Sequence, residues 1–275
     1  MKTPPPLLCA VWLSRLAVIL GLFATPFLRA EPAVPAATLE GGGNRTIDDL
    51  GLTLIWIAPG SFSMGSASAG TDRERPVTQV TLTRGFWLGR TEVTQAQWTA
   101  LMESNPSHFK GDSLPVELVN WNEVMEFCQK LTERERAAGR LSADLAYTLP
   151  TEAQWEYACR AGTTSDTSPA NLDELAWHMA NSGEQTHPVG QKQANPWGLY
   201  DMYGNVWEWC LDWYGDYAGG SVADPRGVPA GPGRIIRGGS WRGSAVDCRA
   251  PYRSAKEWDH RRHGLGLRLA LSAVR

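Results

Sequence analysis

The sequence predicts an α+β domain with little regular secondary structure. Its 275 residues include 28 Gly and 18 Pro, and turn formers at this frequency interrupt long helices and strands. It also holds 13 Trp, and all but Trp12 are spread between Trp56 and Trp258. A chain with many turns and many large aromatic side chains can build its core from separate indole rings, so it needs few continuous helical or strand faces.

Three helices are predicted from their start signals. A Thr or Asn followed three positions later by Glu or Gln forms a capping box, in which the two side chains satisfy N–H groups at the start of a helix. Each such pair here precedes apolar residues at helical spacing. The pairs are Thr94 with Gln97, Asn120 with Glu123, and Thr151 with Gln154. The third helix is expected to end near Gly162.

Five segments have the composition of strands, namely residues 52–57, 79–83, 86–93, 234–237 and 267–271. The first and the last lie at opposite ends of the domain, and we expect them to pair and close the fold through its termini. Residues 163–233 are rich in turn formers and give few definite elements. Ordered segments of this kind commonly depend on metal ions or disulfides.

Residues 1–30 have the pattern of a secretory signal peptide. Lys2 is followed by an apolar run at residues 16–23, and the small residue Ala30 precedes Glu31. The run is shorter than the ~20 residues that a helix needs to cross a bilayer. Residues 31–48 are predicted to be a flexible linker, and residues 49–275 one domain. The mature protein is therefore expected to be secreted or periplasmic, without a membrane span.

The net charge of the chain argues against two classes of binding partner. The formal net charge is −3, and loss of Lys2, Arg15 and Arg29 with the signal peptide makes it −6. An acidic chain disfavours nucleic acid or an anionic membrane as the main partner.

Four cysteines remain after removal of the signal peptide. In an oxidising compartment they allow two disulfides in three connectivities, and the sequence does not decide between these. Because no two of them form a Cys-x-x-Cys pair, a zinc site is disfavoured. The four are Cys128, Cys159, Cys210 and Cys248.

An ordered series of motifs runs from about residue 50 to residue 272. The main ones are Pro59-Gly-Ser-Phe-Ser-Met-Gly65, Phe86-Trp-Leu-Gly-Arg-Thr-Glu-Val-Thr-Gln95, Leu149-Pro-Thr-Glu-Ala-Gln-Trp-Glu-Tyr-Ala-Cys-Arg160, Gly198-Leu-Tyr-Asp-Met-Tyr-Gly-Asn-Val-Trp-Glu-Trp209 and Arg237-Gly-Gly-Ser-Trp241. In this order they resemble the formylglycine-generating-enzyme (sulfatase-modifying factor) family. The resemblance implies a variant C-type-lectin-like fold, in agreement with the composition. Because the family contains oxidases, sulfoxide synthases and members of unknown activity, it leaves the reaction open.

The cysteine pair of the family's oxidases is incomplete in this chain. In those oxidases two cysteines separated by four residues follow the Gly-Gly-Ser-aromatic motif and hold copper(I), a soft ion that prefers thiolates. The corresponding positions here are Gly243 and Cys248, and Gly has no side chain to bind a metal. Formylglycine generation by that route is therefore not expected, and any redox metal is left undefined. Cys248 is expected to be half of a structural disulfide.

The resemblance implies a candidate cleft around the same segment. It would be lined by Ser240, Trp241, Arg242, Cys248 and Tyr252. The expected occupant is a peptide, a protein or a small molecule.

A calcium site is also implied by the resemblance. Asp201 and Glu208 would supply side-chain oxygens, and Gly204 and Val206 would supply backbone carbonyls, in line with the six to eight oxygens that calcium takes. The alternative is that the two acids cap turns while neighbouring tryptophans fill the core. A second calcium site would start at Asn181, but the loop that follows it is short.

His260 and His263 are a third candidate for metal binding. Two histidines three residues apart could bind iron or copper if a third ligand joined them. The alternative is a solvated basic loop. It is favoured because Arg261 and Arg262 lie between the histidines, and cations disfavour a metal.

Two functions follow from these observations. The first is an exported oxidoreductase-type member of the family that acts on a peptide or small metabolite in the cleft, with ligands different from those of the copper oxidases. The alternative is a non-catalytic, calcium-stabilised, lectin-like binding or structural domain. The sequence alone does not decide between catalysis and binding.

Overall fold

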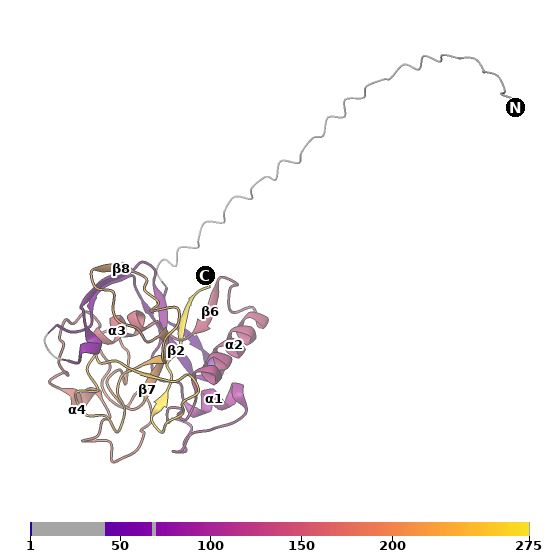
Figure 1. Ribbon diagram of the computed structural model, residues 1–275. Helices are drawn as coiled ribbons and strands as arrows, with labels where there is room; N and C mark the ends of the chain where they lie inside the picture. The colour runs from indigo at the N-terminus through magenta and orange to yellow at the C-terminus, as the bar shows by residue number, and fades with distance from the viewer. Residues whose placement is uncertain (2–41, 68–69, 275) are drawn as a thin grey trace. The chain divides into compact units, whose positions relative to one another are not determined.

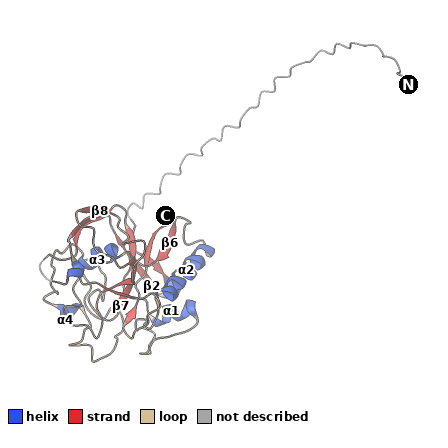
Figure 2. Cartoon of the chain, viewed as in Figure 1, coloured by secondary structure: helices blue, strands red, loops and turns tan. Residues whose placement is uncertain are grey.

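The computed structural model describes Met1 and residues 42–67 and 70–274. Three sheets and four α-helices, joined by long loops, make up this described part (Figure 1, Figure 2). The fold is α+β, a variant of the C-type-lectin-like fold, as predicted. The predicted signal peptide and residues 31–41 of the predicted linker lie outside the described residues. No helix in the described part is long and apolar enough to cross a membrane.

The three predicted helices are confirmed. They are α1 (Gln95–Met102), α2 (Trp121–Ala137) and α3 (Glu152–Arg160), and each begins with the complete predicted capping box. Helix α3 ends at Arg160, and its C-cap residue Ala161 has a left-handed φ of 45° and is followed by Gly162. A short helix and two 3-10 turns were not predicted. They are α4 (Leu172–Leu175), η1 (Asp48–Leu50) and η2 (Asp72–Glu74).

The largest sheet has five antiparallel strands in the order β1-β2-β5-β12-β6. The strands are β1 (Arg45–Ile47), β2 (Leu52–Ile57), β5 (Phe86–Gly89), β12 (Ala270–Ala273) and β6 (Leu145–Thr148). The expected pairing of the first and last predicted strands is wrong, because β5 lies between them. Trp87 of β5 pairs with Trp56 on one side and with Leu271 on the other. All four residues of β5 are buried, which suits a central strand.

Two smaller sheets complete the fold. One has the order β10-β9-β7-β11 and contains β10 (Ser254–Lys256), β9 (Arg234–Arg237), β7 (Trp207–Trp213) and β11 (Leu265–Gly266). The other has the order β3-β4-β8 and contains β3 (Gly60–Met64), β4 (Thr78–Leu82) and β8 (Ser221–Ala223). Strand β9 has its predicted bounds, whereas β7 lies in the turn-rich segment that gave few definite elements.

The end of the predicted linker is part of the domain. Residues 45–47, within the expected flexible segment 31–48, form β1 and pair with residues 52–54 of β2. The indole N–H of Trp87 also donates to the carbonyl of Gly43 at 2.9 Å. These residues have the composition of a linker, but their backbone groups form hydrogen bonds with the edge of the sheet. The folded domain therefore begins several residues earlier than predicted.

Large aromatic side chains dominate the core, as the composition predicted. Trp155 and Trp209 are 0% exposed, and Trp98 of α1 stacks on Phe127 of α2 with ring centroids 5.2 Å apart. Helices α1 and α2 lie side by side, with α2 against β6 (Figure 1).

The expected disulfides are not formed, which corrects the prediction for Cys248. Cys128, Cys159, Cys210 and Cys248 are all free and buried. Cys128 packs among apolar side chains beneath the largest sheet, and the other three belong to a second hydrophobic cluster. In both clusters the thiols pack as small apolar groups.

Candidate functional site

The candidate cleft begins at the turn after β9. Ser240 and Trp241 are 2% and 6% exposed, and the Trp241 indole N–H donates to the carbonyl of His263 at 3.0 Å. Arg242 is exposed and its guanidinium lies 5.2 Å from the centre of the Trp241 ring, whereas Tyr252 is half-buried. Of the five residues predicted to line a cleft, therefore, only Arg242 and Tyr252 have substantial access to solvent.

Cys248 is shielded beneath the Gly-Gly-Ser-Trp turn. A Cβ atom added to Gly239 would lie 2.7 Å from the Cys248 sulfur, so the thiol packs directly against the backbone of that glycine. Burial raises the pKa of the Cys248 thiol to about 12. Copper binding and nucleophilic attack both need a thiolate, and burial disfavours that form of Cys248 in the observed arrangement. Gly243 supplies no second sulfur.

The predicted calcium turn contains two residues with left-handed backbone. Asp201 and Asn205 have φ angles of 57° and 60°, a conformation that Asp and Asn tolerate better than most residues. A Cβ added to Gly204 would meet the carbonyl oxygen of Trp177 at 2.3 Å, so only glycine fits there. These local constraints place the carboxylates of Asp201 and Glu208 in the interior, where they are 1% and 0% exposed.

Glu208 is neutralised by an arginine. Arg268 donates to both of its carboxylate oxygens at 2.7 to 3.0 Å, and the indole N–H of Trp155 donates to Oε2 at 2.6 Å. The arginine also donates to the carbonyls of Gly89 and Tyr200 at 2.9 and 2.8 Å. Arg268 lies near the end of the motif series, which runs to about residue 272, and its role here was not predicted.

A third buried carboxylate, Glu92, was missed by the sequence analysis. Its oxygens accept the backbone N–H of Val206 at 2.9 Å and the side-chain amide of Asn205 at 2.7 Å. The signal was present, because Glu92 lies within the motif that contains β5. The motif was used only for family resemblance.

Buried carboxylates outnumber guanidinium groups in this cluster. Among the described residues Glu92, Asp201 and Glu208 lie around the guanidinium of Arg268, and the charge of Lys192 also acts on Asp201. Burial, and then the charges of Asp201 and Glu208, raise the pKa of Glu92 well above its usual value. Burial raises the pKa of Asp201 to about 6. One oxygen of Asp201 accepts the N–H of Gly190, and the other, Oδ1, is buried with no hydrogen-bond partner in the described part.

A calcium ion fits this cluster only in part. The surplus of carboxyl groups and the unpartnered Oδ1 of Asp201 favour a cation, but both oxygens of Glu208 are already engaged. Among the described residues no three His, Cys, Asp or Glu side chains are placed to share one metal ion. The weaker candidate, Asn181, uses its carbonyl oxygen to accept the N–H of His178 at 2.9 Å and its amide to donate to Ala176. It caps its own turn.

The two histidines near the C-terminus lie in different surroundings. Burial, and then the charges of Lys256 and Arg262, lower the pKa of the half-buried His260. The ring of His263 stacks on that of His108 at 4.4 Å. This arrangement fits the basic-loop interpretation better than a shared metal.

A second buried ionic network involves two glutamates of α3. Arg253 binds Glu152 through two hydrogen bonds of 2.7 Å, and Arg237 pairs with Glu156. Sequence reasoning missed this network, although Glu152 and Glu156 are four residues apart on one helix and therefore share a face. It borders a cavity of about 360 Å³ that Asp212 also lines.

Comparisons with known proteins agree with the motif series. The family described as "Sulfatase-modifying factor enzyme 1-like domain" matches residues 48–273. The chain belongs to the sulfatase-modifying factor, or formylglycine-generating enzyme, family.

Individual relatives divide into two groups by length. The chaperone protein LppX of Paenibacillus barcinonensis is 32% identical over 272 residues, which covers 82% of this chain and 90% of LppX. The formylglycine-generating enzyme of Streptomyces coelicolor is 33% identical over 180 residues, which covers 58% of this chain and 53% of that enzyme. The chain thus spans about half the length of the formylglycine-generating enzyme.

A solved structure extends the likeness to three dimensions. Variable protein 1 of Treponema denticola is 35% identical in sequence and superposes with a TM-score of 0.75, covering 82% of this chain and 97% of that one. The fold is therefore shared over nearly the whole of that protein.

Proposed function

We propose that this member of the family is exported and binds a polypeptide segment beside residues 240–253, without thiolate–copper oxidation. The observation that carries the proposal is the pair of positions 243 and 248. One is a glycine, and the other is a buried thiol that is protonated at neutral pH, because burial raises its pKa to about 12. The chain keeps the fold of the family around positions 243 and 248. These two residues do not supply the pair of thiolates that copper oxidation needs.

The surface beside Gly243 has the character of a binding site. Met179, whose N–H donates to the carbonyl of Gly243 at 3.0 Å, is 64% exposed, and Val246 is 55% exposed. Exposed apolar side chains next to a charged one, here Arg242, are typical of protein interaction surfaces. LppX, which the chain matches over 90% of its length, is named a chaperone protein, and this supports a polypeptide as the ligand.

Binding of a defined polypeptide tests the proposal. The mature chain is titrated with a permanently unfolded test protein, reduced and alkylated, and binding is followed by fluorescence anisotropy. We expect saturable binding that falls at least about tenfold in a Met179→Ser, Val246→Ser double variant, because each lost apolar anchor is worth roughly 1 kcal/mol. Val274→Ser, which removes an exposed side chain elsewhere, is the control. Equal binding by the double variant would contradict the proposal.

An oxidoreductase-type activity with a different ligand set is the second candidate. It is favoured by the likeness to proteins named formylglycine-generating enzyme. Copper titration with oxygen-uptake measurements on cysteine-containing peptides and small thiols tests it. Tight copper binding with substrate-dependent uptake would establish this function in place of simple binding.

We also propose that calcium stabilises the turn at residues 201–208. The buried, unpartnered Oδ1 of Asp201 and the surplus of carboxylates around Arg268 support it. An ion that binds only the folded state stabilises it by about 2.7 kcal/mol at 100 times its dissociation constant. A chelator should therefore lower the melting temperature of the wild type and leave that of Asp201→Asn unchanged. A wild-type melting curve that ignores excess chelator would remove the calcium assignment.

Export is the remaining part of the proposal. The pattern of residues 1–30 supports it, with a cleavage site after Ala30. N-terminal sequencing of the protein recovered outside the cytoplasm should begin at Glu31. Recovery of the uncleaved chain from the cytoplasm alone would contradict it.

A further inference from the structure

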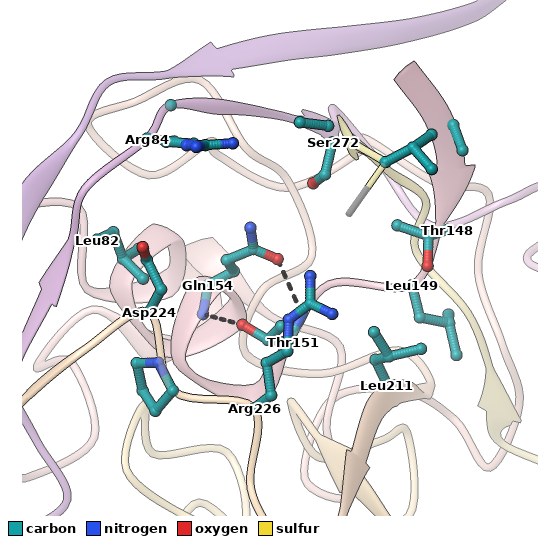
Figure 3. A pocket seen from close by; sticks show the side chains of 15 residues that line it. Leu82, Arg84, Thr148, Leu149, Thr151, Gln154, Leu211, Asp224, Arg226 and Ser272 are labelled. Atoms are coloured by element: carbon teal, nitrogen blue, oxygen red, sulfur yellow. Dashed lines mark hydrogen bonds between the residues drawn. The ribbon is translucent and has the colours of Figure 1, made fainter. Parts of the chain in front are cut away.

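A cavity of about 200 Å³ lies between the edge of the largest sheet and the start of α3 (Figure 3). None of residues 240–253 lines it, so it is separate from the proposed polypeptide site. Two arginines, Arg84 and Arg226, contribute to its wall. In Figure 3 both guanidinium groups face the space between them.

The pairing of two strands brings these arginines together. Strands β4 and β8 are parallel, with Thr81 opposite Ala223, and the N–H of Asp224 donates to the carbonyl of Thr81 at 2.9 Å. The chain therefore leaves both strands at the same end of the sheet. Arg84 follows β4 by two residues and Arg226 follows β8 by three, so residues far apart in sequence line one cavity.

The two arginines of the cavity are exposed, and no side-chain hydrogen bond or ion pair holds either of them among the described residues. Arg226 also acts on the buried carboxylate of Asp212, whose pKa its charge lowers. The carboxylate in the lining, Asp224, is held by Thr83, whose backbone N–H donates to Oδ1 at 2.9 Å and whose hydroxyl donates to Oδ2 at 2.5 Å. Two guanidinium groups beside an engaged carboxylate leave a site that attracts an anion.

A buried hydroxyl points to the same conclusion. The Oγ atom of Ser272, on β12, is buried and has no hydrogen-bond partner among the described residues. Figure 3 shows this oxygen directed into the cavity. A buried hydroxyl normally has a partner, and an oxygen atom of a ligand between the arginines would accept its proton.

Apolar side chains also contribute to the wall, among polar ones such as Thr151 and Gln154. In Figure 3 Leu82 lies on one side, beside Asp224, and Leu149 and Leu211 lie on the other side of Arg226. The volume of the cavity is below the ~300 Å³ at which pockets for drug-sized ligands begin. We propose that this cavity binds a small monocarboxylate with a short aliphatic body. The guanidinium groups and Ser272 bind the carboxylate, and the leucines contact the methylene groups.

The carboxylate class follows from this combination of groups. The planar fork of a guanidinium matches the two oxygens of a carboxylate, as it also matches a phosphate. A phosphate, however, has no apolar portion to place against three leucines and costs more to desolvate. A short fatty-acid anion satisfies both parts of the wall.

Calorimetric titration of the mature chain with butyrate, at constant ionic strength, tests the proposal. Butyrate should bind saturably, phosphate at least tenfold more weakly, and n-butanol, which lacks the charge, not measurably. Arg84→Gln combined with Arg226→Gln should weaken butyrate binding at least tenfold. Lys130→Gln, which removes an exposed charge from α2, should leave it unchanged.

Ser272→Ala separates a binding role from a structural one. The hydroxyl has no partner in the described part of the protein, so its removal should leave the melting temperature unchanged while it weakens butyrate binding severalfold. Equal binding of butyrate and n-butanol, or wild-type affinity in the double arginine variant, would overturn the proposal. Neither result bears on polypeptide binding beside residues 240–253.

Discussion

The buried carboxylate of Asp212 makes the free energy of unfolding depend on pH. It is 4% exposed, and its Oδ2 accepts the backbone N–H of Glu152 at 2.8 Å. Burial, and then the charge of Glu152, raise the pKa of Asp212 to about 7. The unfolded chain loses this proton near pH 4. The folded state keeps it until about pH 7, so the free energy of unfolding falls as pH rises through this range and is level above it.

Asp212→Asn should therefore stabilise the protein at pH 8. The amide keeps an acceptor for the N–H of Glu152 and removes the buried charge, and the gain is on the order of 3 kcal/mol. The gain should shrink towards zero as the pH falls to 4. Urea unfolding at several pH values measures this, with the exposed Asp216→Asn as the control. A gain that is the same at pH 4 and pH 8 would rule out the titration of Asp212 as its cause.

At the scale of the element, the start of α2 depends on Asn120. Its side chain accepts the N–H of Glu123 at 3.0 Å, and the Glu123 carboxylate accepts the N–H of Asn120 at 2.9 Å. Asn120→Ala should cost about 1 kcal/mol, and the melting temperature should fall by roughly 2–4 °C. Asn120→Ser retains an acceptor and should recover most of the loss. A serine variant as unstable as the alanine variant would show that capping is not the cause.

Elements differ in how far the sequence defines them. Helix starts were placed correctly because a capping box uses side chains within four residues of one another. Strand β12 begins at Ala270, three residues after the predicted start, and β5 ends four residues early. Strand bounds depend on the partner strand, which local sequence does not contain.

At the scale of the whole molecule, the stability of the fold is expected not to depend on disulfide bonds. All four described cysteines are free and buried, and burial raises the pKa of Cys128, Cys159 and Cys248 to about 12. A reducing agent should leave the melting temperature of the mature chain unchanged. A thiol reagent should label no cysteine in native buffer and four after unfolding. Fewer than four labelled thiols in the non-reduced, unfolded chain would reveal a disulfide.

The candidate site shows the same division between local and long-range information. The motifs identified Asp201, Glu208, Gly243 and Cys248 as positions of interest, and the absence of a second thiol at Gly243 followed from the sequence alone. Glu92 and Arg268 lie close to Glu208 in the structure, although each is more than 50 residues away from it in the sequence. No local pattern predicts that Arg268 occupies both oxygens of a proposed calcium ligand, because ion pairing in the core is decided by packing.

The sequence by itself determined that this is an α+β domain of the sulfatase-modifying factor family, since composition and ordered motifs are properties of the chain. It also determined the starts of α1, α2 and α3, because helix caps are local. Only the tertiary structure decided that β5 separates β2 from β12 and that Cys248 is a free, shielded thiol. It also placed Arg84 and Arg226 in one cavity. Each of these depends on residues brought together from distant parts of the chain, where burial and pairing set the energy of every polar group.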